Sequence, residues 1–418
     1  MSNSSPSDDP QPHPIQFDIP TPRFSVSSPA SLSQAMEYLN DHGYVVIGDS
    51  YSQQETSQYY DDTWTLLESL PHYNLQRSDP RTWNKWPGVE SKGLISGNGI
   101  GHSKLQWNIR KNKNVRKIFS TLWNTDELIC SYDGIGIYRP YLIDSSWTTR
   151  GRWFHVDQNP HDKPNKCCVQ GFVSLFDQNE YTGGLVVIPG SHKEFSKLKS
   201  VRGVMKGVDY VSVLDISKEF ETIASSCKPI KFVACKQGDV VLWDSRTIHC
   251  NTPSKYAPIN GKGDPVGGDR KEIELKSGIP SSRLLRVVNY VCITPREYAF
   301  KYNGIMRGFT LLNERILCVG NAVSTTHWPF LHIESEDKMS DSHWPTNPNV
   351  LVVDKKVPDT VDLDKDALAL VVGRWPSRAE NYAQLYKDLI PRGETIGKFL
   401  FLLSVFIVVI AMGIKRLI

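Results

Sequence analysis

A histidine and an aspartate stand two residues apart in the segment 152–160, which reads Arg-Trp-Phe-His-Val-Asp-Gln-Asn-Pro. On an extended strand the side chains of His155 and Asp157 project to the same face, because side chains alternate with a period of two. An imidazole beside a carboxylate supplies two of the three protein ligands of a facial non-haem iron(II) site, which takes one more histidine. We take His249 as that third ligand. These residues meet only if a later strand folds back against the first, so the pattern predicts a sheet rolled around the site.

The same spacing also arises by chance, since His192-Lys193-Glu194 and His332-Ile333-Glu334 have the same form. On spacing alone, the pair at 155 and 157 is a surface hydrogen-bonded pair. Its context favours a ligand pair, because aromatic residues precede it, a series of strands follows it, and a histidine closes a later strand. His192 follows a Pro-Gly turn in a lysine-rich stretch, and His332 lies beyond the last predicted strand, so both are expected to be structural.

Short apolar segments separated by turn residues dominate the middle of the chain. Strands are predicted at 44–47, 128–138, 167–176, 185–188, 232–235, 240–243 and 284–293, and helices at 31–42, 52–70, 115–123 and 377–389. Gly238-Asp239 lies between two of these strands and predicts a hairpin. Many short strands with turn signals between them favour a sandwich or barrel over a parallel sheet.

The composition excludes some classes of partner and of chemistry. The formal net charge is +3 and no run of five like charges occurs, so we expect no nucleic-acid partner. The eight cysteines are scattered and include no Cys-x-x-Cys pair, which argues against a zinc or thioredoxin-like site. With no secretory signal at the N-terminus, we expect reduced thiols that are mostly buried.

An uncharged apolar stretch, 399–414, follows Lys398 and precedes Lys415 and Arg416. As a helix it would span roughly 24 Å, somewhat less than a hydrocarbon core of about 30 Å. A buried core helix is the alternative, but all-round hydrophobicity between basic residues favours a transmembrane tail anchor. The catalytic domain would then face the cytosol from the endoplasmic reticulum, the mitochondrial outer membrane or a peroxisome.

Composition also divides the rest of the chain. Residues 1–23 are rich in Ser, Pro and Asp, and we expect a disordered leader there. A barrel domain is expected at 24–334, interrupted by a polar insert at 254–282. A polar accessory segment with one helix, 335–397, would connect this domain to the anchor.

Three matches carry a family resemblance. They are the block Trp-Phe-His-Val-Asp-Gln-Asn, the string Gly-Gly-Leu-Val-Val-Ile-Pro-Gly-Ser-His at 183–192, and Gly238-Asp239 leading to Trp243 and His249. The chain resembles the phytanoyl-CoA dioxygenase family of iron(II)- and 2-oxoglutarate-dependent oxygenases, over roughly residues 32–295. The resemblance implies a mainly β fold with flanking helices, namely a double-stranded β-helix or jelly-roll, cupin-like barrel.

The resemblance also implies the reaction and its ligands. His155, Asp157 and His249 would bind iron(II), and 2-oxoglutarate would chelate the iron. Oxidative decarboxylation to succinate would be coupled to the insertion of oxygen from O2 into a C–H bond. Halogenating relatives lack the carboxylate ligand, so the presence of Asp157 favours hydroxylation.

In this family an arginine on a late strand holds the distal carboxylate of 2-oxoglutarate. A buried carboxylate needs a permanently charged, bidentate partner, which a guanidinium provides better than an ammonium group. Arg286 and Arg283 both begin the strand after the insert, and we prefer Arg286 because it shares a face with Val288 and Tyr290. The long insert is a departure, because the family's arginine normally follows the distal histidine much more closely.

Three further expectations concern the surroundings and the use of the site. Asp244 or Asn251 could accept a hydrogen bond from a ligand histidine. Four tryptophans either line a substrate pocket or pack in the core: Trp83, Trp86, Trp107 and Trp153. The first functional hypothesis is a hydroxylase for a small or lipid-like substrate at a membrane surface. The alternatives are an inactive tail-anchored binding or scaffold protein and a cupin-like metalloenzyme that does not use 2-oxoglutarate.

Overall fold

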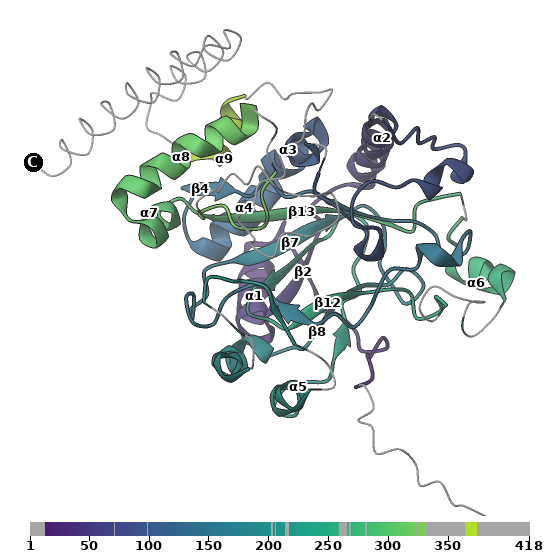
Figure 1. Ribbon diagram of the computed structural model, residues 1–418, viewed down its shortest axis with the longest axis horizontal. Helices are drawn as coiled ribbons and strands as arrows, with labels where there is room; N and C mark the ends of the chain where they lie inside the picture. The colour runs from purple at the N-terminus through teal and green to yellow at the C-terminus, as the bar shows by residue number, and fades with distance from the viewer. Residues whose placement is uncertain are drawn as a thin grey trace, which may run out of the picture.

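Two mainly antiparallel sheets packed face to face form the centre of the molecule (Figure 1). The computed structural model describes residues 13–331, except 71, 98, 202–203, 205, 214–216, 259–265, 267–268, 281, 321 and 323, and residues 364–373. The large sheet has the order β1 (Arg23–Ser25), β2 (Tyr44–Gly48), β11 (Val240–Asp244), β7 (Val169–Ser174), β13 (Arg286–Pro295), β5 (Ile135–Tyr138) and β3 (Leu94–Ile95). Strand β4 (Leu128–Cys130) also pairs with β13. The small sheet has the order β10 (Lys231–Phe232), β8 (Gly184–Val187), β12 (His249–Thr252), β6 (His155–Val156) and β9 (Val211–Ser212). The predicted mainly β fold with flanking helices is confirmed.

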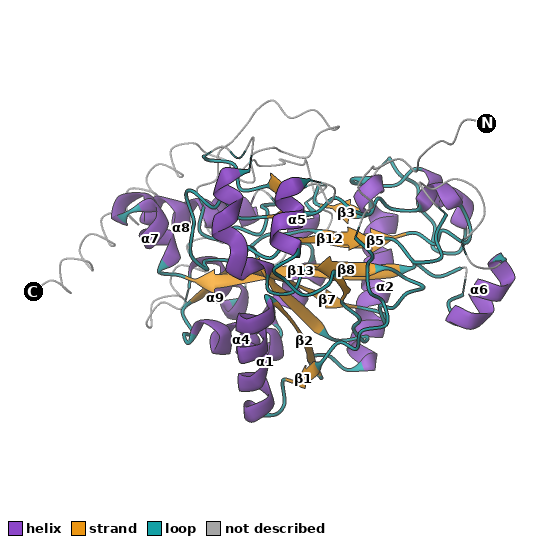
Figure 2. Cartoon of the chain, turned by 90° about the horizontal axis from the view of Figure 1, so that it is seen from below, coloured by secondary structure: helices purple, strands orange, loops and turns teal. Residues whose placement is uncertain are grey.

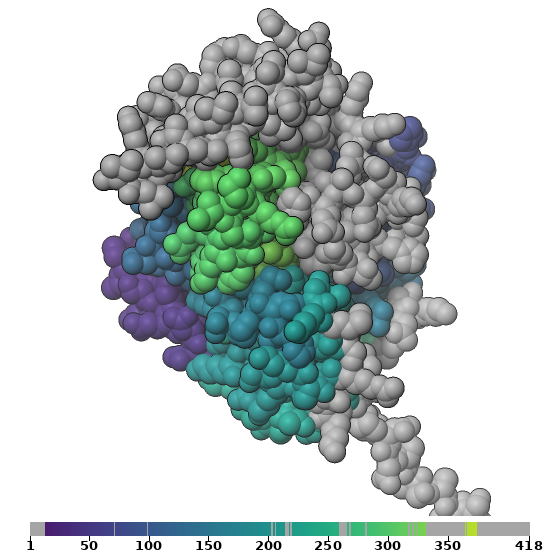
Figure 3. Space-filling model, turned by 60° about the vertical axis from the view of Figure 1, so that its left-hand side comes forward, coloured from purple at the N-terminus to yellow at the C-terminus, as the bar shows by residue number. Residues whose placement is uncertain are grey.

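Helices cover the outer faces of the two sheets (Figure 2). The α-helices are α1 (Pro29–His42), α2 (Gln53–Ser69), α3 (Lys104–Lys111), α4 (Lys113–Trp123), α5 (Lys218–Ala224), α6 (Arg270–Ser277), α7 (Tyr298–Asn303), α8 (Ile305–Gly320) and α9 (Lys365–Val372). Short 3-10 helices lie at Pro80–Asn84, Glu90–Lys92, Ile100–His102, Ser145–Trp147 and Ser191–Ser200. In Figure 3 the green segment with α7 and α8 lies against the blue-to-teal part of the chain, where Leu311 and Phe330 pack on Cys167 and Cys168.

Alternation along β2 explains how one strand serves two cores. Val45 and Ile47 belong to the core between the large sheet and α1 to α4, whereas Tyr44 and Val46 face the space between the sheets. Period-two alternation of apolar residues on both faces is what a strand buried on both sides requires. Side chains on the inner face of each strand therefore line the space between the sheets, where the candidate site described below lies.

The predicted N-terminal helices are present with small shifts of their first residue. Helix α1 begins at Pro29 and its cap is Ser28, whose hydroxyl accepts from the Ser31 amide, so the helix starts earlier than expected. Helix α2 begins at Gln53, one residue after the predicted start, because Ser52 is its cap and forms a reciprocal capping box with Glu55.

The predicted hairpin around Gly238 is wrong. Strand β10 pairs with β8 in the small sheet, while β11 pairs with β2 and β7 in the large sheet. The backbone turns at Gly238, with φ +83°, and a Cβ there would meet the Tyr51 carbonyl oxygen at 2.5 Å. The tight turn therefore carries the chain from the small sheet to the large sheet. Local sequence signals do not distinguish such a crossing from a hairpin.

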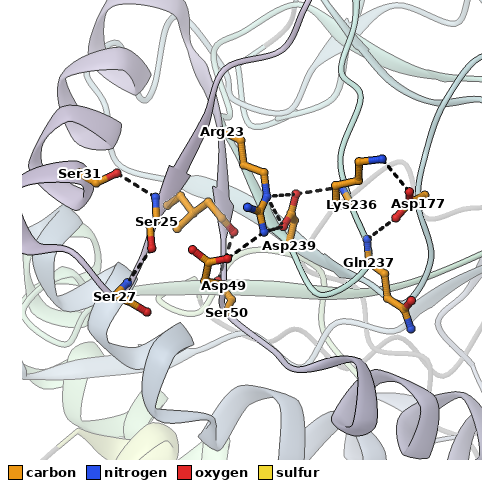
Figure 4. A network of polar contacts seen from close by, with 11 residues as sticks. Arg23, Ser25, Ser27, Ser31, Asp49, Ser50, Asp177, Lys236, Gln237 and Asp239 are labelled. Carbon is orange, nitrogen blue, oxygen red and sulfur yellow. Dashed lines mark hydrogen bonds and ion pairs between the residues drawn. The ribbon is translucent and has the colours of Figure 1, made fainter.

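The expectation of an unstructured leader is wrong for residues 13–23. Gln16 pairs with Lys231 beside β10, and the rings of Phe17 and Phe232 stack with centroids 5.0 Å apart. Arg23 then binds the carboxylate of Asp239, which is fully buried, through contacts of 2.9 Å (Figure 4). The Gly-Asp motif thus attaches the N-terminal segment to β11.

Replacing Asp239 with asparagine should lower the free energy of unfolding by about 1 kcal/mol, because Arg23 loses its anionic partner. The effect is modest since the Arg23 side chain is 40% exposed and solvent screens the pair. Urea unfolding followed by tryptophan fluorescence measures it. Asp49→Asn is the control, because Asp49 is half exposed and contacts the same arginine, and its effect should stay within about 0.5 kcal/mol.

The two ends of the chain are described only in part. No helix in the described ranges is long and apolar enough to cross a bilayer. The predicted anchor at 399–414 and the predicted helix at 377–389 lie outside the described residues, as does most of the segment 335–397. The polar insert contains helix α6. None of the eight cysteines, all within the described residues, is in a disulfide, and seven of them are buried, in line with the expected reduced thiols.

Candidate metal centre and cofactor cavity

The three predicted ligand residues converge between the sheets. His155 on β6 lies directly opposite His249 on β12, because these strands pair in antiparallel register. The His155 Nε2 atom is 3.5 Å from Asp157 Oδ1, and the His249 Nε2 atom is 3.3 Å from Asp157 Oδ2. One ligand atom from each residue lies within 4.8 Å of the other two. Strand pairing therefore brings together residues that are distant in the chain.

Both imidazoles are fixed in the tautomer that a metal requires. The Nδ1 atom of His155 is 3.0 Å from the Trp153 carbonyl oxygen, and that of His249 is 2.9 Å from the Thr247 carbonyl oxygen. A carbonyl oxygen only accepts, so Nδ1 carries the proton and Nε2 keeps its lone pair. Each acceptor is a backbone carbonyl two residues before its histidine.

The expected side-chain acceptors are not used for this purpose. Asp244 instead forms a bidentate ion pair with Arg246, with contacts of 2.9 and 2.7 Å. Asn251 bonds to Arg286 and Tyr138. The prediction that Asp244 or Asn251 orients a ligand histidine is therefore wrong, because the backbone of each histidine's own strand takes that role.

The charge states of the donors suit a cation. Burial alone would raise the pKa of Asp157, but the neighbouring imidazoles of His155 and His327 hold that pKa well below its usual value. Burial lowers the pKa of His155, although Asp157 opposes the effect. Gln170 donates to Asp157 Oδ2 over 2.9 Å and holds the carboxylate in place. The site thus presents an anionic oxygen donor from Asp157 and a neutral imidazole nitrogen from His155.

Two aromatic rings stack on His155. The Trp153 ring stacks on it at 4.6 Å and 10°, and the Tyr210 ring lies at 4.8 Å and 27°. The ammonium group of Lys92 lies 4.3 Å from the centroid of the Trp153 ring. A cavity between the two sheets has His155, Asp157 and His249 in its lining. Of the four tryptophans singled out from the sequence, Trp153 lines this cavity. The other three pack in the core beneath the large sheet: Trp83, Trp86 and Trp107.

Arg286 lines the same cavity and is 2% exposed. Its Nη1 donates to Asn251 over 2.9 Å and to Gln178 over 3.4 Å, and its Nε is buried without a hydrogen-bond partner. Among the residues that the structure describes, no carboxylate lies within ion-pair distance of it. Burial lowers the pKa of Arg286, but a guanidinium remains charged. Arg283, the alternative, packs on the Phe176 ring at 4.0 Å and does not line the cavity.

Sequence reasoning missed several polar residues of the cavity. Tyr138 lies directly opposite Arg286 in the β5–β13 pair, and Asp133 precedes β5. His327 lies beyond the last strand, with Nε2 3.3 Å from the Asp157 carbonyl oxygen. Tyr138 ends a predicted strand. Only the register between that strand and the strand after the insert places Tyr138 beside Arg286, and the sequence does not give this register. His192, judged structural, contacts the Asn40 carbonyl oxygen and does not line the cavity. His332 lies outside the described residues.

The residues present fit both iron(II) and 2-oxoglutarate. Two imidazoles and one carboxylate on one face of a site are the donor set of a non-haem iron(II) centre. A buried guanidinium without an internal anion fits the distal carboxylate of the oxo acid.

The family model described as phytanoyl-CoA dioxygenase matches residues 146–253, which contain all three ligand residues. The resemblance to the phytanoyl-CoA dioxygenase family is confirmed. Iron and 2-oxoglutarate are the cofactor and co-substrate that this family uses with O2, and the cavity contains residues suited to both.

Two relatives and one solved structure extend this result. "Ava biosynthesis cluster protein O" of Aspergillus versicolor is 28% identical over 299 residues, which cover 69% of this chain and 83% of that protein. A "putative phytanoyl-CoA dioxygenase" of Dictyostelium discoideum is 23% identical over 255 residues, or 52% and 70% of the two chains. The crystal structure of GlcNAc Inducible Gene 2 from Candida albicans superposes with a TM-score of 0.50 at 13% identity, over 92% and 88% of the chains, which shows a shared fold.

Proposed function

We propose that the protein is an iron(II)- and 2-oxoglutarate-dependent dioxygenase that hydroxylates a C–H bond of a small or lipid-like substrate. One observation carries the proposal. A three-ligand set and a buried guanidinium without a carboxylate partner line one cavity. An arginine buried for structure alone would have its donors satisfied by the protein, whereas the Nε of Arg286 is buried without a hydrogen-bond partner.

Each residue has a distinct task in this proposal. His155, His249 and Asp157 would hold the metal through Nε2, Nε2 and a carboxylate oxygen. Arg286 would bind the distal carboxylate of 2-oxoglutarate and so orient its oxo-acid end toward these ligands. The bound metal supplies open coordination positions for the oxo acid and O2. In the overall reaction, substrate, O2 and 2-oxoglutarate give hydroxylated substrate, succinate and CO2.

The lining of the cavity supports an apolar target bond. Phe172, Leu185, Trp243, Val288 and Val291 line it together with the polar groups. Apolar walls exclude water and would hold an aliphatic or aromatic part of the substrate by burial. The carboxylate of Asp157 occupies the third ligand position, which supports hydroxylation over halogenation.

The apolar stretch 399–414 supports the further proposal that the domain works at a membrane surface, facing the cytosol. It is apolar throughout and has basic flanks, as a tail anchor has, and flanking lysines that snorkel can compensate for a span shorter than the hydrocarbon core. Co-fractionation of the full chain with membranes, and its release into the soluble fraction on deletion of 399–414, would support the anchor. A full chain that stays soluble in cells would contradict it.

The test of the proposed function is succinate formation by the full chain, loaded anaerobically with iron(II), then given 2-oxoglutarate and air. We expect succinate that depends on iron(II). No iron-dependent succinate would favour the scaffold alternative. Stoichiometric metal binding with indifference to 2-oxoglutarate would favour the cupin-like metalloenzyme.

Two arginine variants form a matched pair for this assay. Arg286→Gln should raise the Kd for 2-oxoglutarate by roughly 100-fold, because a buried charge-assisted contact is lost. Arg283→Gln should change it by less than about 2-fold, since its guanidinium lies on Phe176 outside the cavity. Calorimetric titration measures both values. The opposite ranking would assign the carboxylate contact to Arg283.

A further inference from the structure

The partners of Arg286 are all uncharged. Its Nη1 donates to the side-chain oxygens of Asn251 and Gln178, and its carbon centre lies 3.6 Å from the centroid of the Tyr138 ring. Carboxamides and an aromatic face hold a guanidinium in place without neutralising it. The cavity therefore keeps a full positive charge available to a ligand.

The Asn251 carboxamide can adopt only one orientation. Arginine has donors only, so the oxygen of Asn251 faces Nη1 at 2.9 Å and its nitrogen faces the Tyr138 hydroxyl at 2.6 Å. Tyr138 therefore accepts a hydrogen bond from Asn251, and its own O–H is left to donate elsewhere in the cavity.

Strand register puts Asn251 between the two ends of the site. It follows His249 by two residues on β12, so the two side chains share a face. Arg286 and Tyr138 are direct cross-strand neighbours on β13 and β5 of the other sheet. One side chain of the small sheet thus holds the carboxylate-binding pair of the large sheet at a fixed position relative to the metal ligand.

We propose that Asn251 is a positioning residue that makes the site selective for a 2-oxo diacid. Its neutral carboxamide fixes Arg286 without cancelling its charge, and it turns the Tyr138 hydroxyl hydrogen toward the distal carboxylate as a second donor. This inference rests on the proposed function. An aspartate at position 251 has nearly the same shape, but its carboxylate would neutralise Arg286 in place of the distal carboxylate of the ligand and so weaken ligand binding.

The experiment compares Asn251→Asp with Asn251→Ala in the full chain, using 2-oxoglutarate and cobalt(II) as probes. We expect Asn251→Asp to weaken 2-oxoglutarate binding by about 30- to 100-fold and Asn251→Ala by only about 5- to 10-fold. Cobalt(II) affinity, read from its visible bands, should stay within about 2-fold of wild type in both. A purely structural role predicts the reverse order, because aspartate keeps the hydrogen bond to Arg286 and alanine loses it.

Controls separate this inference from the proposed function. Asn165→Asp adds the same charge at an exposed position and should leave 2-oxoglutarate affinity unchanged. Tyr138→Phe keeps the ring on Arg286 but removes the hydroxyl donor, and it should weaken 2-oxoglutarate binding roughly 10-fold. If Asn251→Asp does not fold, Tyr138→Phe is the variant that tests the inference. Wild-type affinity for 2-oxoglutarate in the variant tested, or an equal loss of cobalt(II) affinity, overturns the inference. A wild-type protein that binds cobalt(II) but no 2-oxoglutarate overturns the proposed function instead.

Discussion

Asp157→Ala is expected to lower the affinity for iron(II) by more than about 100-fold and to abolish iron-dependent succinate formation. The variant removes the single anionic donor of the set and leaves the two imidazoles, whose ring centroids are 4.3 Å apart. It also removes one of the two acceptors of the Gln170 amide, which keeps its contact with the Ser245 hydroxyl. Anaerobic titration with iron(II) and a succinate assay measure the two effects.

The control for this variant is another carboxylate of the same cavity. Asp133 lines the cavity, and its carboxylate accepts a hydrogen bond from Ser131 over 2.7 Å. Asp133→Asn should keep iron(II) affinity within about 3-fold of wild type, because no imidazole lies within ion-pair distance of Asp133 in the described part of the chain. If Asp157→Ala bound iron(II) normally, the assignment of the metal centre would be wrong.

Arg315→Met is expected to lower the free energy of unfolding by about 3–4 kcal/mol. Arg315 on α8 is 1% exposed, and its guanidinium donates to backbone carbonyl oxygens. The acceptors lie on β4, before Phe330 and at the end of α9: Cys130, Pro329, Leu370 and Val371. Methionine fills a similar volume but leaves these buried acceptors without a donor. Thermal unfolding followed by circular dichroism would show the loss.

A second arginine on the same helix provides the comparison. Arg307 is exposed, so Arg307→Met should change the free energy of unfolding by less than about 0.5 kcal/mol. Equal stability of the two variants would mean that α9 does not depend on Arg315 for its attachment to the barrel. The carbonyls at the end of α9 carry the negative end of its dipole, which adds to the attraction of the guanidinium.

Local spacing predicted which residues form the candidate metal site but not the groups that hold those residues in place. Strand periodicity predicted that His155 and Asp157 share a face, although Asp157 lies in the bend just after β6. The third ligand, His249, followed from the chemistry of the donor set. The acceptors for the imidazoles could not be chosen, because backbone carbonyls are present everywhere in a sequence. Arg286 was preferred from the pattern of its own strand, whereas Tyr138 required the register between β5 and β13, which lie far apart in the chain.

Errors in the fold prediction share one physical origin. The segments around Gly238 have strand propensity and a tight turn, which is the local signature of a hairpin. Whether two such strands pair with each other depends on the other strands available to each. Here β10 pairs with β8 and β11 pairs with β7 instead. Similarly, the composition of residues 13–23 suggested disorder, but the partners Phe232 and Asp239 lie more than 200 positions away in the chain.

The position of Arg286 is set by its pairing with β5 and β7, and that of His249 by its pairing with β6 and β8. Neither depends on the length of the connection that carries α6. Because the entropic cost of a longer loop rises only slowly with its length, such a connection can grow without moving the catalytic groups. The interval between histidine and arginine is therefore free to vary among relatives, and this arginine is better recognised by strand register than by counting residues.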